Sequence, residues 1–308
     1  MATLNAADFA REAPLVIGEK PLEQDFVQGP LLGKGTFGEV WKCRHRETGQ
    51  VCAVKAVNLK MAKGDPKKKA WLMQEAQLQA LCQHDKVVKV FEVFRWGNIL
   101  YIIEELLGGG SLMDLACPRG IWGHLPEDRV AFIASQVVAA LAKLHHIGVV
   151  HRDIKPDQFL MARPYDVSTV KLCDFGLAGL ADDFAAMKIP CGTPMFMAPE
   201  AMETAMQPRA PYGPPVDMWA VGITVHLLLL GEPPFYPPRT HRPKDEVPRL
   251  HRDIVTGNRK PLTGRGWAAV SGEARDFVEA CLQLDPARRL TADQARQHPW
   301  LAGLNAQH

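Results

Sequence analysis

Three charged side chains of this sequence stand in surroundings that favour chemistry. Lys55 lies among apolar residues, Asp153 closes the triplet 151–153, and Asp174 follows the strand-like residues 170–173. An ammonium group among apolar neighbours needs an anionic partner. A carboxylate can accept the proton of a hydroxyl group, and a carboxylate at a strand end is a hard oxygen ligand for Mg²⁺. Together they suggest a site for an anionic ligand and a metal ion beside a group that can accept a proton.

A glycine-rich stretch precedes Lys55 and suits the binding of phosphate groups. Gly33, Gly35 and Gly38 form the pattern G-x-G-x-x-G, and their missing side chains let backbone N–H groups approach phosphate oxygens. Dinucleotide-binding folds use the same pattern to open a helix, whereas here it runs into the strand-like residues 40–44. The spacing also excludes a P-loop. The glycines therefore predict a phosphate-binding hairpin.

The composition bounds the class of protein. A chain of 308 residues that is 47% hydrophobic can bury a large core, and we expect two lobes. The net charge of +2 gives no reason to expect binding to nucleic acid or an anionic membrane. Seven scattered cysteines without a C-x-x-C pair favour reduced thiols in the cytoplasm, without excluding the nucleus. We expect no secretory leader and no membrane span, because the longest apolar run, residues 221–230, is too short.

Periodicity divides the chain into a strand-rich part and a helical part. Residues 25–100 contain β-branched segments and one helical pattern at 70–82. Helical patterns dominate after the glycine run 108–110, for example at 129–145. The loop glycines and the lysine thus come from the first part, and both acids come from the second.

Six motifs in one fixed order resemble the signature of the eukaryotic protein kinases. The resemblance covers residues from about 26 to 301, and the sequence at 153–156 is typical of the serine/threonine branch. In motif style the chain is similar to the calcium/calmodulin-dependent kinases and their upstream activating kinases. The motifs are GKGTFGEV at 33–40, AVK at 53–55, Glu75, HRD at 151–153, DFG at 174–176 and APE at 198–200.

This resemblance implies a bilobal protein kinase fold of the α+β class. A small N-lobe with an antiparallel sheet and one main helix would extend over about 26–104. A hinge would follow at about 105–110, and a larger, mostly helical C-lobe at about 111–301. Residues 1–25 would form an N-terminal extension, and residues 302–308 would form a C-terminal tail.

The resemblance also implies an ATP-dependent serine/threonine protein kinase that uses Mg²⁺ and transfers the γ-phosphate to protein hydroxyl groups. Asp153 would orient the hydroxyl, and Lys155 would stabilise charge on the transferred phosphate. Asp174 and Gln158 would hold the metal ion. The residues implied in nucleotide binding are Leu32, Gly33, Gly35, Gly38, Val40, Ala53, Lys55, Glu75, Glu105, Leu106 and Leu160.

Three positions near the nucleotide depart from the family pattern. Gln158 stands where the family has asparagine, and we expect a weakened or rearranged second metal site because Mg²⁺ tolerates little geometric error. Glu104 aligns with the gatekeeper position, and Gln79 aligns with a helix position that is normally apolar. We expect these two side chains to form a hydrogen bond, since a lone buried carboxylate is costly. A slip of the alignment by one residue is the alternative.

The segment 174–200 contains a single hydroxyl residue, Thr193. By resemblance Thr193 belongs to the floor that receives the substrate and forms hydrogen bonds with the catalytic loop. We therefore predict activity without phosphorylation of this segment, with Asp182 and Asp183 supplying fixed negative charge to basic groups such as Arg152. The alternative is that both aspartates are solvated loop residues.

Two other acids are implied in structural roles. Glu200 is expected to pair with Arg289 and so to anchor the substrate-binding segment. Asp217 is expected to accept backbone hydrogen bonds from the catalytic loop inside the helical lobe. In each case the loss of one partner would be damaging.

The expected partners are ATP, a protein substrate bearing Ser or Thr, and a regulatory protein. Basic residues between 239 and 252 would suit an acidic docking partner, and a solvated face is the alternative. Asp157 is a candidate contact for a basic substrate residue. Ser111 stands where basophilic relatives often have an acid, so the preference for basic substrates stays open.

The main alternative function is that of a pseudokinase, a scaffold that binds nucleotide without turnover. Gln158 and Glu104 favour this alternative. The presence of Lys55, Glu75, Asp153 and Asp174 speaks against it, because a scaffold has no use for a carboxylate that orients a hydroxyl group. A metabolic small-molecule kinase is disfavoured by the substrate-platform motif at 193–200.

Overall fold

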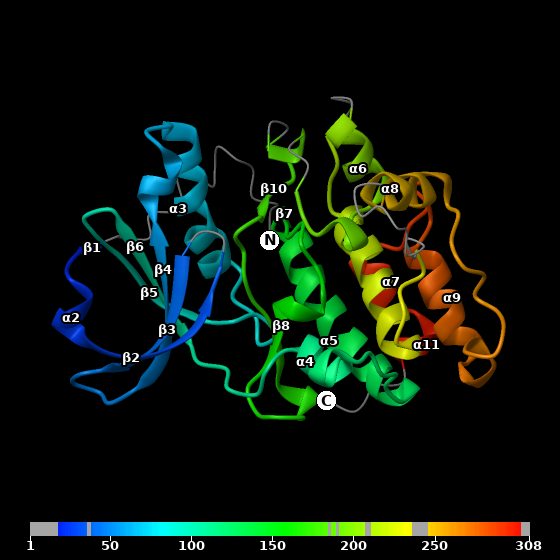
Figure 1. Cartoon of the computed structure of the whole chain (residues 1–308), viewed down its shortest axis with the longest axis horizontal. Helices are drawn as coiled ribbons and strands as arrows, with labels where there is room; N and C mark the ends of the chain where they lie inside the picture. Colours follow the sequence, from blue (N-terminus) through cyan, green and yellow to red (C-terminus); the bar gives the residue numbers. More distant parts are fainter. Residues whose placement is uncertain are drawn as a thin grey trace.

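A computed structural model describes residues 18–35, 38–183, 186–188, 191–206, 211–235 and 246–302. The predicted C-terminal tail from residue 303 onward, most of the N-terminal extension and the basic residues at 239–245 lie outside these ranges. Figure 1 shows a sheet with one long helix at the left and a group of helices at the right. The predicted α+β bilobal fold is therefore confirmed.

The smaller lobe is built on a six-stranded sheet with the order β1-β5-β6-β4-β3-β2. All neighbouring strands are antiparallel except β1, which runs parallel to β5 with Gly18 opposite Phe94. The sheet thus extends eight residues before the predicted start at Phe26. The bounds are β1 Gly18–Glu19, β2 Phe26–Lys34, β3 Gly38–His45, β4 Val51–Asn58, β5 Val90–Trp96 and β6 Ile99–Glu105, with the short helix α2 at Leu22–Asp25.

One long helix, α3 (Pro66–Leu81), packs on this sheet. It begins four residues before the predicted 70 because the preceding residues favour a helix start. Proline is well suited to the first turn, and the side chain of Asp65 accepts a hydrogen bond from the amide of Lys68 at 3.4 Å. Leu72 of α3 is buried in a cluster with sheet residues.

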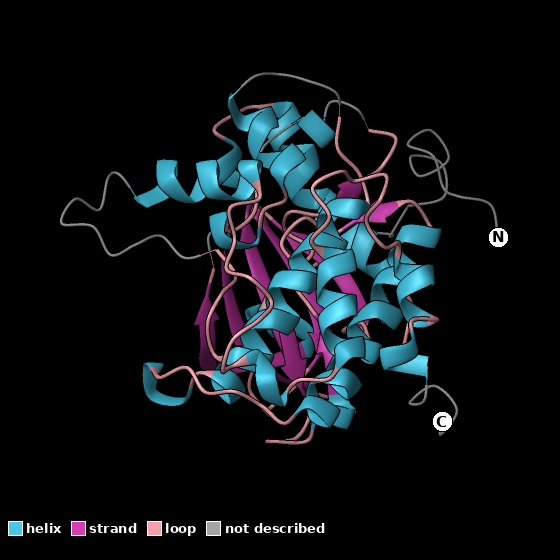
Figure 2. Ribbon diagram, turned by 90° about the vertical axis from the view of Figure 1, so that its right-hand side faces the viewer, coloured by secondary structure: helices cyan, strands magenta, loops and turns pink. Residues whose placement is uncertain are grey.

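The larger lobe is mostly helical, and helix α7 lies at its centre. Every residue of α7 from Val216 to Leu229 is buried, as the apolar run predicted. Figure 2 shows the helices of this lobe in front of the strands. No helix in the described ranges is both long and apolar enough to cross a membrane. The helices are α4 Leu112–Ala116, α5 Glu127–His146, α6 Pro199–Met206, α7 Pro215–Leu230, α8 Glu246–Thr256, α9 Gly272–Cys281, α10 Ala292–Arg296 and α11 Pro299–Ala302.

Four short strands of the larger lobe carry the loops that face the smaller lobe. β7 (Val149–Val150) pairs with β10 (Gly179–Leu180), and β8 (Phe159–Met161) pairs with β9 (Val170–Leu172). The triplet 151–153 directly follows β7, and Asp174 lies two residues after β9. These strands therefore place both predicted acids on the same side of the lobe.

Candidate active site

A cleft of about 580 Å³ is lined by residues of both lobes. It contains every residue predicted to bind nucleotide except Glu75, which lies behind it and contacts Lys55. Glu105 directs its carboxylate to the amide of Lys89 at 2.8 Å and to Lys171 at 2.6 Å, so this hinge residue links the two lobes. The cleft residues that had not been singled out for binding are Lys34, Lys42, Val88, Glu104, Leu107, Gly108, Gly110 and Cys173.

The glycine-rich stretch forms the predicted hairpin between β2 and β3. Gly33 pairs with Val40, and residues 36–37 lie outside the described ranges. A Cβ atom at Gly38 would lie 1.9 Å from the carbonyl oxygen of Ala56, whereas one at Gly33 would meet nothing within 4 Å. Gly38 is thus required by the close approach of β3 to β4, and Gly33 leaves open space at the cleft.

Lys55 is held between one acid from each lobe. Its Nζ atom contacts Glu75 of α3 and lies 2.8 Å from Oδ1 of Asp174. Burial opposes the charged form, but the attraction of Glu75 and then of Asp174 raises the pKa of Lys55 well above its usual value. The ammonium group is therefore fixed at the place where the lobes meet.

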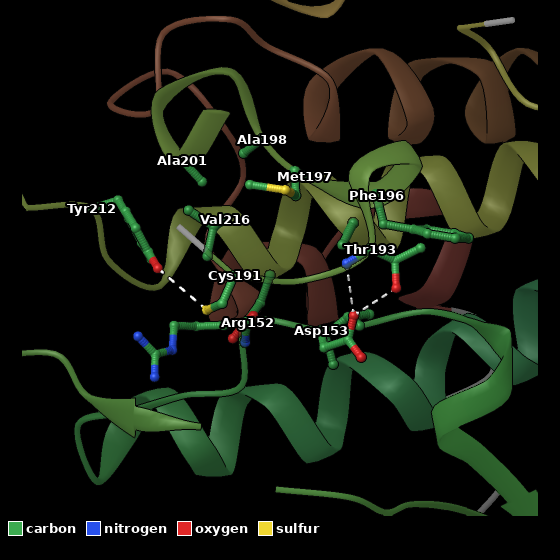
Figure 3. Close-up of a pocket in the computed structure, with 13 residues that line it drawn as sticks. Arg152, Asp153, Cys191, Thr193, Phe196, Met197, Ala198, Ala201, Tyr212 and Val216 are labelled. Carbon is green, nitrogen blue, oxygen red and sulfur yellow. Dashed lines mark hydrogen bonds between the residues drawn. The ribbon is translucent and has the colours of Figure 1, made fainter. Parts of the chain in front are cut away.

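Asp153 lies in a dense network of hydrogen-bond donors. Its Oδ1 atom accepts hydrogen bonds from the amide and the hydroxyl of Thr193, both at 3.0 Å, as Figure 3 shows. Its Oδ2 atom accepts from Lys155 at 2.6 Å and from Nε2 of Gln158 at 3.0 Å. The predicted contact of Thr193 with the catalytic loop is confirmed, and the four donors fix the orientation of the carboxylate.

Asp174 has a strained backbone and a strongly acidic side chain. Its φ angle of 61° lies in the left-handed region, which non-glycine residues rarely adopt. Partial desolvation in the cleft opposes ionisation, but the charge and hydrogen bond of Lys55 hold the pKa of Asp174 at about 2. A permanent carboxylate therefore faces the cleft beside the ammonium group.

Gln158 bridges the two acids through its amide nitrogen. Nε2 donates to Asp153 and, at 3.3 Å, to Oδ2 of Asp174, whereas the amide oxygen lies 3.9 Å from the thiol of Cys173. Oxygen is the ligand that Mg²⁺ requires. The amide would have to rotate to serve as a metal ligand, so that role of Gln158 stays a prediction.

The sequence of the chain can be compared with those of known protein families. The family model described as the protein kinase domain matches residues 26–301. The chain belongs to the protein kinase family. It is a serine/threonine protein kinase, in agreement with the relatives described next.

Three relatives illustrate this similarity. A probable myosin light chain kinase of Dictyostelium discoideum is 33% identical over 277 residues, which cover 90% of this chain and 83% of the relative. The calcium/calmodulin-dependent protein kinase cmkB of Emericella nidulans is 33% identical over 292 residues, covering 92% and 67%. Human serine/threonine-protein kinase H1 is 34% identical over 280 residues, covering 90% of this chain and 61% of that kinase.

The base of the kinase catalytic loop is anchored by Asp217 of α7. Oδ2 accepts from the amide of His151 at 2.9 Å and lies 2.9 Å from Nε2 of His145, while Oδ1 accepts from the amide of Arg152 at 2.8 Å. Burial opposes the charge, but these donors lower the pKa of Asp217. The predicted anchoring role is confirmed.

The substrate-binding segment of the kinase is anchored by the predicted pair of Glu200 and Arg289. Nη1 and Nη2 of Arg289 reach the two carboxylate oxygens of Glu200 at 2.6 and 3.0 Å. Arg289 also lies with its guanidinium 5.1 Å from the ring of Trp219. Such a bidentate geometry is among the strongest that an ion pair can adopt.

The kinase holds Arg152 with backbone oxygens. Nε donates to the carbonyl of Leu177, and Nη2 donates to the carbonyl of Ala178 at 3.4 Å. The side chain also interacts with the phenol of Tyr212 and points away from Asp153 (Figure 3). The sequence had suggested acidic side chains as partners for Arg152, and it contained no signal for these carbonyl groups.

The rear wall of the kinase cleft contains the predicted contact between Gln79 and Glu104. Nε2 of Gln79 donates to Oε1 of Glu104 at 2.7 Å and to the carbonyl of Val88 at 3.3 Å. Glu104 lines the cleft. Burial raises the pKa of Glu104 to about 7, although Lys55 and the hydrogen bond from Gln79 act in the opposite direction. The hydrogen-bonding hypothesis is confirmed.

The residues that had been considered for substrate preference differ in their surroundings. Asp157 is exposed. Ser111 is buried and caps α4, where its hydroxyl accepts from the amide of Asp114 at 3.1 Å and donates to the carboxylate at 2.8 Å. The side chain of Ser111 is thus used to cap the helix, whereas the side chain of Asp157 is exposed to solvent.

Proposed function

We propose that this kinase binds Mg²⁺ and ATP in the cleft and transfers the γ-phosphate to a serine or threonine hydroxyl of a protein substrate. The observation that carries the proposal is the convergence of three side chains from separate elements. Lys55 of β4 lies 2.8 Å from Asp174, and Gln158 donates to both Asp174 and Asp153. Lys55 and the candidate metal-binding carboxylate Asp174 therefore line one cleft, and Gln158 links them to the candidate base Asp153, which is the arrangement that phosphoryl transfer requires.

Each polar side chain has one task in this proposal. Lys55 holds phosphate oxygens of ATP, and Glu75 keeps its ammonium group in place. Asp153 accepts the hydrogen bond of the substrate hydroxyl in exchange for one of its present donors, and Lys155 neutralises charge on the transferred group. Asp174, with its pKa of about 2, offers the carboxylate oxygens that suit a magnesium ion. The metal ion would supply neutralisation of phosphate charge, and Gln158 would join its ligands after an amide rotation.

The kinase is further proposed to act without phosphorylation of the segment 174–200. A phosphate in such a segment commonly orders it by pairing with arginine. Here carbonyl groups of Leu177 and Ala178 already hold Arg152, and Thr193 is bonded to Asp153. Fixed negative charge from Asp182 and Asp183 is part of the same proposal.

The free thiols of all seven cysteines support an intracellular location.

The test is transfer of labelled phosphate from Mg-ATP to a generic protein substrate. Wild-type protein produced with a phosphatase is compared with the Asp153→Asn variant, and mass spectrometry examines residues 174–200. We expect turnover by the unphosphorylated wild type and a loss of at least roughly 100-fold in the variant. Equal turnover of both proteins would contradict the assigned role of Asp153. A many-fold gain on phosphorylation of the segment would contradict the proposed mode of control.

One observation favours the pseudokinase alternative. The amide nitrogen of Gln158, rather than its oxygen, faces Asp153 and Asp174. A protein of this kind would bind ATP and show no transfer above the Asp153→Asn background at any Mg²⁺ concentration. Replacement of Gln158 by Asn, the residue usual in the family, would then be the matched variant for the recovery of activity.

A further inference from the structure

We propose that Gln79 and Glu104 form a polar latch, which holds helix α3 in the rotation that brings Glu75 to Lys55. The inference rests on the proposed function in one respect, namely that the pair of Lys55 and Glu75 serves ATP. Gln79 and Glu104 are positioning residues in this view, since they act through Glu75.

The spacing on α3 couples Gln79 to Glu75. The two residues are four positions apart and therefore lie one above the other on the same face of the helix. Both side chains are buried, at 2% and 3% exposure. Any rotation of α3 that moves one of them from the sheet must also move the other.

The latch attaches α3 to the middle of the sheet. Its acceptor, Glu104, lies in β6, where it is paired with Ala53 of β4 and with Val90 of β5. The second acceptor is the carbonyl of Val88, just before β5. One glutamine amide thus ties the helix to β6, a strand with partners on both sides, and to the segment that leads into β5.

The apolar contacts of α3 do not by themselves fix the rotation of this helix. Leu72 and Ala76 belong to the cluster under the sheet, whereas Leu78 belongs to the core of the larger lobe together with Phe175. Apolar burial has no preferred direction, and here it draws the helix toward both lobes. Hydrogen bonds weaken steeply when the geometry changes, so the amide can select one rotation.

The charges around Glu104 explain why it depends on Gln79. The groups that face it are Lys55 of β4, Glu75 of α3 and Asp174 after β9. The ammonium group of Lys55 contacts the other two acids. Oε1 of Gln79 has no hydrogen-bond partner among the described residues. A proton on Glu104 would supply the missing donor, and the pair would then be neutral and complete.

The experiment compares Gln79→Leu, Glu104→Met, the double variant and Glu104→Gln. Hydrogen exchange of residues 66–81 reports the attachment of α3, and kcat and KM for ATP report its effect on turnover. Gln136→Leu is the matched control, because Gln136 is a buried glutamine of α5 that bonds to Lys86 and to Val167 at 2.6 and 2.7 Å. It should lower the melting temperature without any selective effect on α3.

We expect each single apolar replacement to raise the exchange of α3 and to lower kcat by about tenfold or more. The double variant should lose no more protection of α3 and no more kcat than either single variant, because the removal of one partner already opens the latch. Glu104→Gln keeps an acceptor for Gln79 and should retain the protection. KM for ATP is free to change in the Glu104 variants, since Glu104 lines the cleft.

Two results would overturn the latch. One is unchanged exchange of α3 in Gln79→Leu, and the other is additive damage in the double variant. Hydrogen exchange can be read without catalysis, so a kinase that fails to transfer phosphate would leave this test intact. A kinase that transfers phosphate normally in Gln79→Leu would refute the latch and leave the proposed function standing.

Discussion

Two carboxylates of this kinase, the buried Asp217 and the half-buried Glu104, differ in their chemistry. Asp217, at the base of the catalytic loop, is 1% exposed and receives hydrogen bonds from two backbone amides, with His145 as a third partner. Glu104, at the rear of the cleft, receives one hydrogen bond from an amide side chain. The pKa of Asp217 is lowered, and the pKa of Glu104 is raised to about 7.

The difference shows that burial alone does not decide the charge of an acid. Desolvation is the first cause acting on both groups, and in both it favours the neutral form. The surrounding groups decide the outcome. Hydrogen bonds and the two histidines favour the ionised form of Asp217, whereas the charges of Glu75 and Asp174 add to the effect of burial on Glu104. Asp217 therefore serves as a permanent anion, whereas Glu104 is balanced between two forms near neutral pH.

Removal of the charge of Asp217 should have the largest effect on the stability of the protein. Asp217→Asn replaces one acceptor oxygen by an NH₂ group, which then faces a donor such as the amide of His151 or Arg152. We expect a loss of about 4 kcal/mol in the free energy of unfolding, measured by urea denaturation. Asp276→Asn, at a carboxylate that is 74% exposed, is the control and should change little. A loss below about 1 kcal/mol for Asp217→Asn would contradict the anchoring role.

The second prediction concerns the opposite pH dependence of the two acids. The pKa of Glu104 is raised from 4.5 to about 7, so its contribution to stability is fully present below pH 4.5 and is lost as the pH rises to about 7. The wild type should lose up to about 3 kcal/mol over this window relative to Glu104→Gln. Unfolding by urea at a series of pH values measures the difference. Parallel curves for both proteins would show that Glu104 keeps its ordinary pKa. The lowered pKa of Asp217 places its own loss of stability at acid pH instead.

The smallest effect comes from removing a single donor of Asp217. His145→Phe takes away the contact at 2.9 Å and leaves both backbone amides in place. We expect a loss of about 1 kcal/mol, because the carboxylate keeps most of its stabilisation. His145→Gln, which retains a donor, should recover part of this loss in the same thermal unfolding measurement. An effect as large as that of Asp217→Asn would mean that the histidine dominates the anchor.

The sequence predicted the parts of the site that belong to fixed motifs. Lys55, Asp153 and Asp174 each stand in a triplet with a known place in the kinase fold, so their convergence could be expected. The contact between Gln79 and Glu104 could also be predicted, because both positions align with neighbours in the family and a lone buried acid is costly.

The remaining features depend on atoms that a sequence pattern does not contain. The orientation of the Gln158 amide is set by the positions of two acids and a thiol. The partners of Arg152 are carbonyl groups, which every residue possesses, so no residue type marks them. Strand β1 has two residues, too few for an alternating pattern to be visible. Val88 lines the cleft, and it belongs to an irregular segment that carries no recognisable motif.

The parallel pairing of β1 has a consequence for the solubility of the molecule. Exposed strand edges can recruit strands of other chains, and β1 shields the edge of β5 near Phe94 and Arg95. Lys20 reinforces this cover by bonding to Glu92 at 2.5 Å and to Asp25 at 2.6 Å. A kinase domain that begins at the family boundary, Phe26, would therefore lack β1 and would expose the edge of β5 to pairing with strands of other molecules.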